Sequence, residues 1–395
     1  SGEKTPIQPM PKKGEKAYRW NWDAPLLISP HDNKTLYFAA NRVFKSINRG
    51  DDWQTISPDL TREIDRNELE VMGQVWSMDA VMKNASTTIY GNIVAMDESP
   101  KKQGLLYAGT DDGLIQISEN GGDSWTKYNS FVGVPPNTRV NQIHASPTDE
   151  NMVYAIFNNH RAGDFKPYVL KSNNKGKTWT SITNDLPERG SAFTIRQDYV
   201  DPNLLFVGTE FGCYFSNDGG KMWNKLGGLP TIAIYDLDIQ QRENDLVVAS
   251  FGRGFYVLDN YSPLRSLNTE VLDKKAHLFP IKEALLYVPS APLGLRGTGS
   301  QGADLWNAEN PDFGATFTLY LKEGDKTLKE IRQEEDKKKE EKKLAAYYPT
   351  IDEIRAENID EKGQLIWIIR NDKGEEIRRI LTSPSKGMSR ISWNL

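Results

Sequence analysis

The sequence has few of the residues that build disulfide or metal sites. Its 395 residues include one cysteine, Cys213, and four histidines. A single thiol excludes an internal disulfide framework, and its apolar neighbours predict a buried, inert side chain. No Cys-x-x-Cys or His-Glu-x-x-His spacing occurs, and no glycine-rich loop follows a strand and opens a helix. We therefore expect no metal and no cofactor.

Long apolar runs and an excess of positive charge are also missing. No run of about 18 apolar residues occurs, so we expect no transmembrane segment. The net charge of -5 argues against nucleic-acid binding, which favours a basic face. With 38% hydrophobic and 26% charged residues, the composition is ordinary for a globular protein.

One short pattern, Ser-x-Asx-x-Gly-x-x-Trp, occurs four times, each time after an apolar run. Asx side chains bond to backbone amides ahead of them, and glycine supplies a positive φ, so each copy predicts a tight hairpin turn. The tryptophan opens the next strand and buries a large face. We expect these residues to be structural. They are Ser46, Asn48, Gly50, Trp53, Ser118, Asn120, Gly122, Trp125, Ser172, Asn174, Gly176, Trp179, Ser216, Asp218, Gly220 and Trp223.

This pattern resembles the Asp-box, or BNR, repeat of sialidases, sortilin/Vps10 ectodomains and two-propeller xyloglucanases. Four further stretches sharpen the resemblance: Ile56–Thr61, Gly109–Leu114, Asn159–Arg161 with Asp164–Tyr168, and Gly252–Asp259. Together they are similar to large secreted bacterial proteins of the sortilin/Vps10-like, "glycosyl hydrolase, BNR repeat" type. The resemblance covers most of residues 20–395 and implies an all-β protein built on a β-propeller.

The spacing of short strands and turns predicts the domain organisation. We expect a linker at 1–19, propeller blades at 20–262, a connecting segment at 263–314 and an Ig-like β-sandwich at 315–395. The connecting segment contains a glycine-rich stretch at 294–302. The sandwich carries a helical insertion at 326–362, where Lys and Glu at i, i+4 spacing predict a protruding charged helix over Thr327–Lys343.

The blades are fewer than a whole propeller of this type contains. Five units are recognisable, and the fifth has no Asp-box. We expect the chain to be a fragment or processed piece of a longer secreted protein. The missing blades would lie upstream or in a partner chain.

Residues at equivalent turns of successive blades should face the same part of a propeller. On this basis Asp111, Glu210 and Arg253 are expected to share one rim. Asp112 and the pair His160 and Arg161, which interrupt a strand exit, are further ligand-binding candidates; a structural role competes with each. Asp111 and Glu210 are also the catalytic candidates.

Two catalytic classes can be weighed against these residues. A sialidase needs an Arg cluster, and no motif here places three Arg at one channel mouth. Other glycosidases need two facing carboxylates, and nothing in the sequence pairs the available ones. Those carboxylates are Asp23, Asp79, Asp97, Asp111, Asp112 and Glu210. Whether the chain is an enzyme stays open.

Three functions are consistent with these patterns. The first expectation is a binding protein that recognises protein, peptide or glycan through blade loops and the central channel. The alternatives are a xyloglucanase- or sialidase-like glycoside hydrolase and a structural subunit of a surface assembly. In each case the protein would be secreted, periplasmic or on the outer surface of a bacterium.

Overall fold

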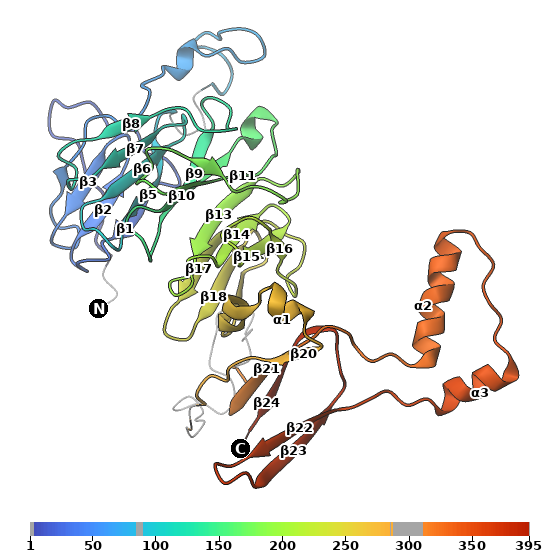
Figure 1. Cartoon of the computed structure of the whole chain (residues 1–395). Coiled ribbons are helices and arrows are strands. Elements are labelled where there is room, and N and C mark those ends of the chain that lie inside the picture. The colour runs from blue at the N-terminus through green and yellow to red at the C-terminus, as the bar shows by residue number, and fades with distance from the viewer. Residues whose placement is uncertain (1–3, 84–89, 285, 287–310, 395) are drawn as a thin grey trace. The chain divides into compact units, whose positions relative to one another are not determined.

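The computed structural model describes residues 4–83, 90–284, 286 and 311–394. Its chain divides into two compact units, Ser1–Arg265 and Ser266–Leu395 (Figure 1). The glycine-rich stretch 294–302 lies outside the described residues. Among the described residues, no helix is long and apolar enough to cross a membrane.

The first unit is a series of β-propeller blades. Each blade is one antiparallel sheet whose strands follow one another in chain order. The first four blades are β1 (Leu26–Ile28) to β4 (Gln54–Thr55), β5 (Ile93–Glu98) to β8 (Thr126–Tyr128), β9 (Arg139–Ala145) to β12 (Thr180–Ser181), and β13 (Ala192–Gln197) to β16 (Asn224–Lys225). Their middle strands are β2 (Leu36–Ala39), β3 (Val43–Ser46), β6 (Leu106–Thr110), β7 (Ile115–Ser118), β10 (Val153–Asn158), β11 (Tyr168–Ser172), β14 (Leu205–Thr209) and β15 (Gly212–Ser216). The fifth has three strands, β17 (Ile234–Gln240), β18 (Asp245–Ser250) and β19 (Phe255–Leu258).

The repeated Ser-x-Asx-x-Gly-x-x-Trp pattern forms the turn between the third and fourth strands. In the fourth blade, Ser216 Oγ accepts from the Gly220 amide at 2.9 Å, and Asp218 Oδ1 accepts from the Met222 amide at 3.1 Å. Gly220 has φ +90, a value that glycine adopts without strain. The same Ser-to-Gly bond closes the other three turns.

The tryptophan of this turn ties its blade to the preceding segment. Trp125 Nε1 donates to the Ile56 carbonyl at 3.0 Å, and Trp223 Nε1 donates to the Ile182 carbonyl at 2.8 Å. Each isoleucine directly follows the last strand of the blade before. In the first blade, Trp53 Nε1 donates to Ile7, which lies in the stretch predicted to be a linker.

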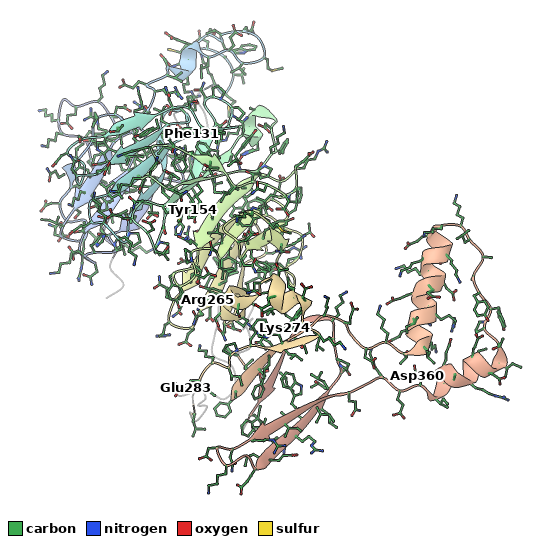
Figure 2. All side chains as sticks on the ribbon, in the orientation of Figure 1. Phe131, Tyr154, Arg265, Lys274, Glu283 and Asp360 are labelled. Atoms are coloured by element: carbon green, nitrogen blue, oxygen red, sulfur yellow. The ribbon has the colours of Figure 1, made fainter. Side chains whose placement is uncertain are left out.

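The core of the first unit lies between successive blades. Phe131 and Tyr154 belong to two of its clusters, one shared by blades two and three and one by blades three and four (Figure 2). Gly208, in β14, lies close to Ile234 of the next blade. A Cβ added at Gly208 would lie only 2.7 Å from the Ile234 carbonyl oxygen, so a larger residue would not fit. Cys213 is fully buried, as predicted.

The fifth blade is less covered than the fourth. Every residue of β15 is buried, whereas Phe255 in β19 is 75% exposed. A buried network follows this blade: the Asp198 carboxylate accepts from Arg265 Nε and Nη2, both at 2.8 Å, and from the Tyr261 hydroxyl. The 3₁₀ turn η3 (Ser262–Ser266) carries Arg265.

In its described residues, the second unit contains two small antiparallel sheets and three helices. One sheet has the order β20 (Ala276–Leu278), β21 (Ala315–Leu321) and β24 (Gly387–Trp393), and the other pairs β22 (Leu365–Arg370) with β23 (Glu376–Thr382). The helix α1 (Thr269–Asp273) comes before them. Two helices, α2 (Leu328–Glu341) and α3 (Ile351–Ile359), occupy the predicted insertion, where one was expected. The pair Thr350 and Glu353 caps α3, a sequence signal that would have located it.

Candidate functional site

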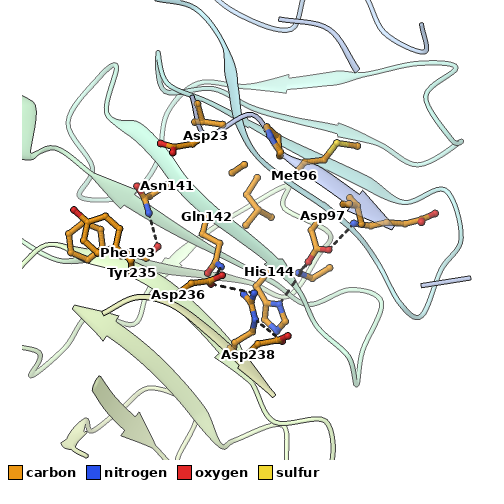
Figure 3. Close-up of a pocket in the computed structure, with 18 of the residues that line it drawn as sticks. Asp23, Met96, Asp97, Asn141, Gln142, His144, Phe193, Tyr235, Asp236 and Asp238 are labelled. Atoms are coloured by element: carbon orange, nitrogen blue, oxygen red, sulfur yellow. Dashed lines mark hydrogen bonds and ion pairs between the residues drawn. The ribbon is translucent and has the colours of Figure 1, made fainter. Parts of the chain in front are cut away.

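A groove of about 960 Å³ runs along the innermost strands of the blades (Figure 3). Its walls come from β1, β5, β9, β13 and β17, the first strand of each blade, and from the turn after β10. The volume is within the range of small-molecule binding sites. The lining is mixed, with carboxylates, guanidinium groups, amides and aromatic rings.

A β-bulge at the same place in four inner strands shapes this wall. The pairing of β5, β9, β13 and β17 with their neighbours skips one residue in each strand. Bulges bend a strand and re-aim side chains, and they are frequent beside active sites. All four skipped residues line the groove: Val94, Asn141, Phe193 and Tyr235.

Two of these skipped residues form an aromatic stack. The rings of Phe193 and Tyr235 lie 4.4 Å apart at an interplanar angle of 15°. Phe251 extends the stack, with its ring 5.2 Å from that of Tyr235. Tyr235 is 49% exposed, so the stack presents aromatic surface at the groove.

Three residues further along, each inner strand places an ionisable side chain in the groove. Asp97, His144, Arg196 and Asp238 hold the same position in β5, β9, β13 and β17. Asp97, His144 and Arg196 each pair with the second residue of the next strand in the blade, which is β6, β10 or β14. We call this set the carboxylate end of the groove.

Asp97 is held at the centre of backbone hydrogen bonds. Its Oδ2 accepts from the Ala145 amide at 2.8 Å, and its Oδ1 accepts from the Glu98 amide at 2.9 Å. The side chain is 26% exposed. Burial raises the pKa of Asp97 to about 6, against the opposing effects of the Ala145 hydrogen bond and the Arg196 charge. Asp97 can therefore carry a proton near neutral pH.

His144 lies beside Asp97 and is neutral. Burial, and then the charge of Arg196, lower the pKa of His144 well below its ordinary value. Its Nε2 accepts from the Gln197 amide at 3.2 Å, so the ring proton is on Nδ1. Nδ1 lies 3.9 Å from Asp97 Oδ2.

Arg196 joins this pair to two exposed carboxylates. Its Nη2 lies 3.6 Å from Asp236 Oδ1, and its Nε lies 3.8 Å from Asp238 Oδ1. Gln142 Nε2, in β9 of the third blade, also donates to Asp236 Oδ1 at 3.4 Å. The carboxylate end, together with the adjacent Asp236, thus has one acid held by backbone amides and two carboxylates held by a guanidinium.

Basic side chains gather at the opposite end of the inner strands. Arg139 begins β9, and its Nη2 lies 3.0 Å from Asp23 Oδ2. His160 and Arg161 follow β10 on the 3₁₀ turn η2 (His160–Ala162). All three basic residues line the groove. We call Arg139, His160 and Arg161 the cationic end.

Of the ligand-binding residues predicted from sequence, only His160 and Arg161 line the groove. Asp111 is buried, and its Oδ1 accepts from the Gly91 and Asn92 amides. Asp112 is buried as well and accepts from the Arg62 amide and the Thr110 hydroxyl. Both carboxyls have a pKa raised by burial.

Glu210 and Arg253 lie outside the groove lining, although both occupy the predicted equivalent turns. Glu210 is partly exposed at the turn after β14, near enough to raise the pKa of His160 against the larger effect of burial. Arg253 is exposed in the turn between β18 and β19. The common rim of Asp111, Glu210 and Arg253 stays a prediction.

Sequence reasoning overlooked the row formed by His144, Arg196 and Asp238. Asp97 was only one of several unpaired carboxylates. Aligning three inner strands on Ser99, Ser146 and Asp198 would have brought Asp97, His144 and Arg196 into one row. The fifth blade has Gln240 at that position, so Asp238 carries no such signal. Within the described part of the chain, no three His, Cys, Asp or Glu side chains form a group that could hold a metal.

Comparisons with known proteins find partial similarity. No protein-family model matches. A probable oligoxyloglucan-reducing end-specific xyloglucanase of Neosartorya fischeri is 24% identical over 38% of this chain and 25% of its own length. A xyloglucanase of a Paenibacillus species is 27% identical over 40% of this chain and 16% of its own. The matched parts thus cover about a quarter or less of these relatives.

One solved structure among the similar ones is the GH74 xyloglucanase from Xanthomonas campestris. It has a TM-score of 0.42 and 18% identity, and the match covers 59% of this chain and 36% of the other. That score is too low to support a functional argument.

Proposed function

We propose that this chain forms a glycan-binding groove of a glycoside hydrolase that acts on a polysaccharide. The row of Asp97, His144, Arg196 and Asp238, contributed by four successive blades to one groove, is the observation that carries the proposal. The two xyloglucanase relatives favour a hydrolase over a binding protein without activity, and they make β-linked glucans the first substrates to test.

The groove offers the two kinds of contact that a sugar chain needs. The exposed aromatic stack of Phe193 and Tyr235 provides flat apolar surface for the C–H face of a sugar ring. The amides of Asn141 and Gln142 and the carboxylate of Asp236 provide hydrogen-bonding groups nearby. Because the stack and the carboxylates share one groove, a bound chain would pass both.

Asp97 has the properties of a general acid. Glycosidases use one protonated carboxyl to donate to the leaving oxygen and a second carboxylate as base or nucleophile. A pKa of about 6 keeps a useful fraction of Asp97 protonated at mildly acidic pH. Asp236 or Asp238, beside Arg196, supplies the second carboxylate.

A polysaccharide substrate also implies a secreted, periplasmic or cell-surface location.

The test is hydrolysis by the purified protein. Xyloglucan, mixed-linkage β-glucan and cellulose oligosaccharides would be incubated at pH 5 to 6 and the products identified by mass spectrometry. We expect cleavage of at least one, with Asp123→Asn, an exposed position outside the groove, as active as the parent. Binding without cleavage of any β-glucan would leave a lectin-like protein and contradict the proposal, as would the absence of binding.

A further inference from the structure

We propose that the cationic end of the groove binds a sugar carboxylate, so that the polysaccharide recognised carries uronic acid residues. This inference rests on the glycan-binding function proposed above. It adds the chemical class of the substrate, which the carboxylate end does not determine.

The two arginines of the cationic end line the same groove, and their charges act on each other. The charge of Arg161 is among the causes that lower the pKa of Arg139, after burial. Like charges held near one another repel, and an anion between them removes that repulsion. Arginine also presents paired N–H donors that match a carboxylate in a bidentate arrangement.

The acidic groups nearby are already engaged or set apart from Arg161. Asp23 pairs with Arg139, and Asp111 accepts hydrogen bonds from backbone amides and from Asn92. Across the residues that the structure describes, no carboxylate lies within ion-pair distance of Arg161. Its guanidinium is therefore exposed at the groove with its donors available to a ligand.

The loop that presents Arg161 is fixed by its own side chains. Asp164 Oδ2 accepts from Asn159 Nδ2 at 3.1 Å and from the Tyr168 hydroxyl at 2.6 Å. The His160 amide donates to Asn158 Oδ1 at 3.1 Å, and Gly163 closes the turn with φ +76. A loop held in this way loses little freedom when a ligand binds.

His160 supplies the neighbouring contact. Its Nδ1 bonds to Asn158 Oδ1, so Nδ1 carries the proton and Nε2 is an acceptor. Burial and the two arginine charges lower the pKa of His160. A uronic acid carries both a carboxylate and hydroxyl groups. The Arg161 guanidinium can bind the carboxylate, and the neutral His160 ring beside it can accept a hydrogen bond from a hydroxyl.

Calorimetric titration tests this inference with three probes. They are a β-linked gluco-oligosaccharide that contains one glucuronic acid residue, the same oligosaccharide after carboxyl reduction, and that reduced form sulfated at O6 of the same residue. We expect the uronate form to bind at least tenfold more tightly than the reduced form. That preference should fall below threefold in Arg161→Ala and as the NaCl concentration rises.

Two variants control the measurement. Arg161→Lys keeps the charge but not the fork of donors and should retain only part of the preference. Arg242→Ala removes an exposed guanidinium that lies outside the groove lining and should retain all of it. Circular dichroism would verify that each variant is folded.

The outcomes separate this inference from the proposed function. Equal binding of the uronate and reduced forms overturns the carboxylate site and leaves the glycan groove standing. Tighter binding of the sulfate ester than of the uronate overturns the assignment to a carboxylate. If neither these probes nor neutral β-glucans bind, the proposed function fails together with the inference.

Discussion

The two ends of the groove hold their charges in different ways. At the carboxylate end, Asp97, His144 and Arg196 lie in paired strands, and the charge of Arg196 lowers the pKa of both Asp97 and His144. At the cationic end, Arg161 lies on an exposed turn, and among the described residues no carboxylate forms an ion pair with it. The strand-held groups are therefore paired with one another, whereas the loop-held guanidinium keeps its donors available to a ligand.

The largest expected effect of this difference is on stability at the carboxylate end. The pKa of Asp97 is raised from 3.8 to about 6, so ionising Asp97 costs folding free energy. The protonated carboxyl therefore contributes to the free energy of unfolding below pH 3.8. This contribution, at most about 3 kcal/mol, is lost as the pH rises through 6. Asp97→Asn has no such term.

Urea unfolding of the parent and of Asp97→Asn at pH 4 and pH 8 measures this term. Relative to the parent, the free energy of unfolding of the variant should be higher at pH 8 than at pH 4. An unchanged difference would show that Asp97 ionises normally in the folded protein. Exposed Asp123→Asn serves as the control and should track the parent.

Between the two ends, the aromatic stack should contribute to affinity. Replacing Tyr235 by alanine removes its exposed ring from the groove. We expect a loss of about 1 kcal/mol, or about fivefold in Kd, for the tightest-binding oligosaccharide. The exposed Tyr348→Ala, in the second unit, is a matched control and should bind as the parent does.

A smaller shift tests whether the strand-held charges are coupled. The positive charge of Arg196 lowers the pKa of Asp97. Arg196→Gln should therefore raise that pKa further and move the falling limb of the pH–rate profile to higher pH. In Arg161→Ala, which changes the loop-held end, the limb should stay in place. Equal movement in both variants would contradict the distinction between the two ends.

The smallest effect is expected at Arg253. It was predicted to share a rim with Asp111 and Glu210, but it lies outside the groove lining. Arg253→Ala should change the oligosaccharide Kd by less than twofold in the titration used above. A loss of tenfold or more would restore the predicted rim.

The sequence pattern predicted the propeller well because repetition determines architecture. Four hairpin turns with the same residues can only close the same kind of sheet, and the helix over Thr327–Lys343 followed from its charge spacing. The inner-strand bulges were not predicted, since an extra residue such as Phe193 leaves no mark in a strand of mixed pattern. Without the bulges, it could not be predicted that the row from Asp97 to Asp238 faces the groove.

The candidate site was harder to predict for a further physical reason. Asp111 and Asp112 have the residue types of a catalytic pair, yet backbone amides, among them that of Arg62, donate to their oxygens. Whether a carboxylate is a cap or a free acid depends on backbone groups close to it in space, which a single sequence does not list. His160 and Arg161 were singled out because they interrupt an apolar strand exit, and the structure places both at the groove.

The most direct test is to measure binding and cleavage together in Asp97→Asn. If the carboxylate end performs acid catalysis in a glycan groove, this variant should bind the cleaved oligosaccharide with a Kd within threefold of the parent. Its turnover should fall by about 10² to 10⁴, the usual contribution of a general acid. Turnover at the parental rate would contradict the assignment of Asp97 and with it the account of the carboxylate end.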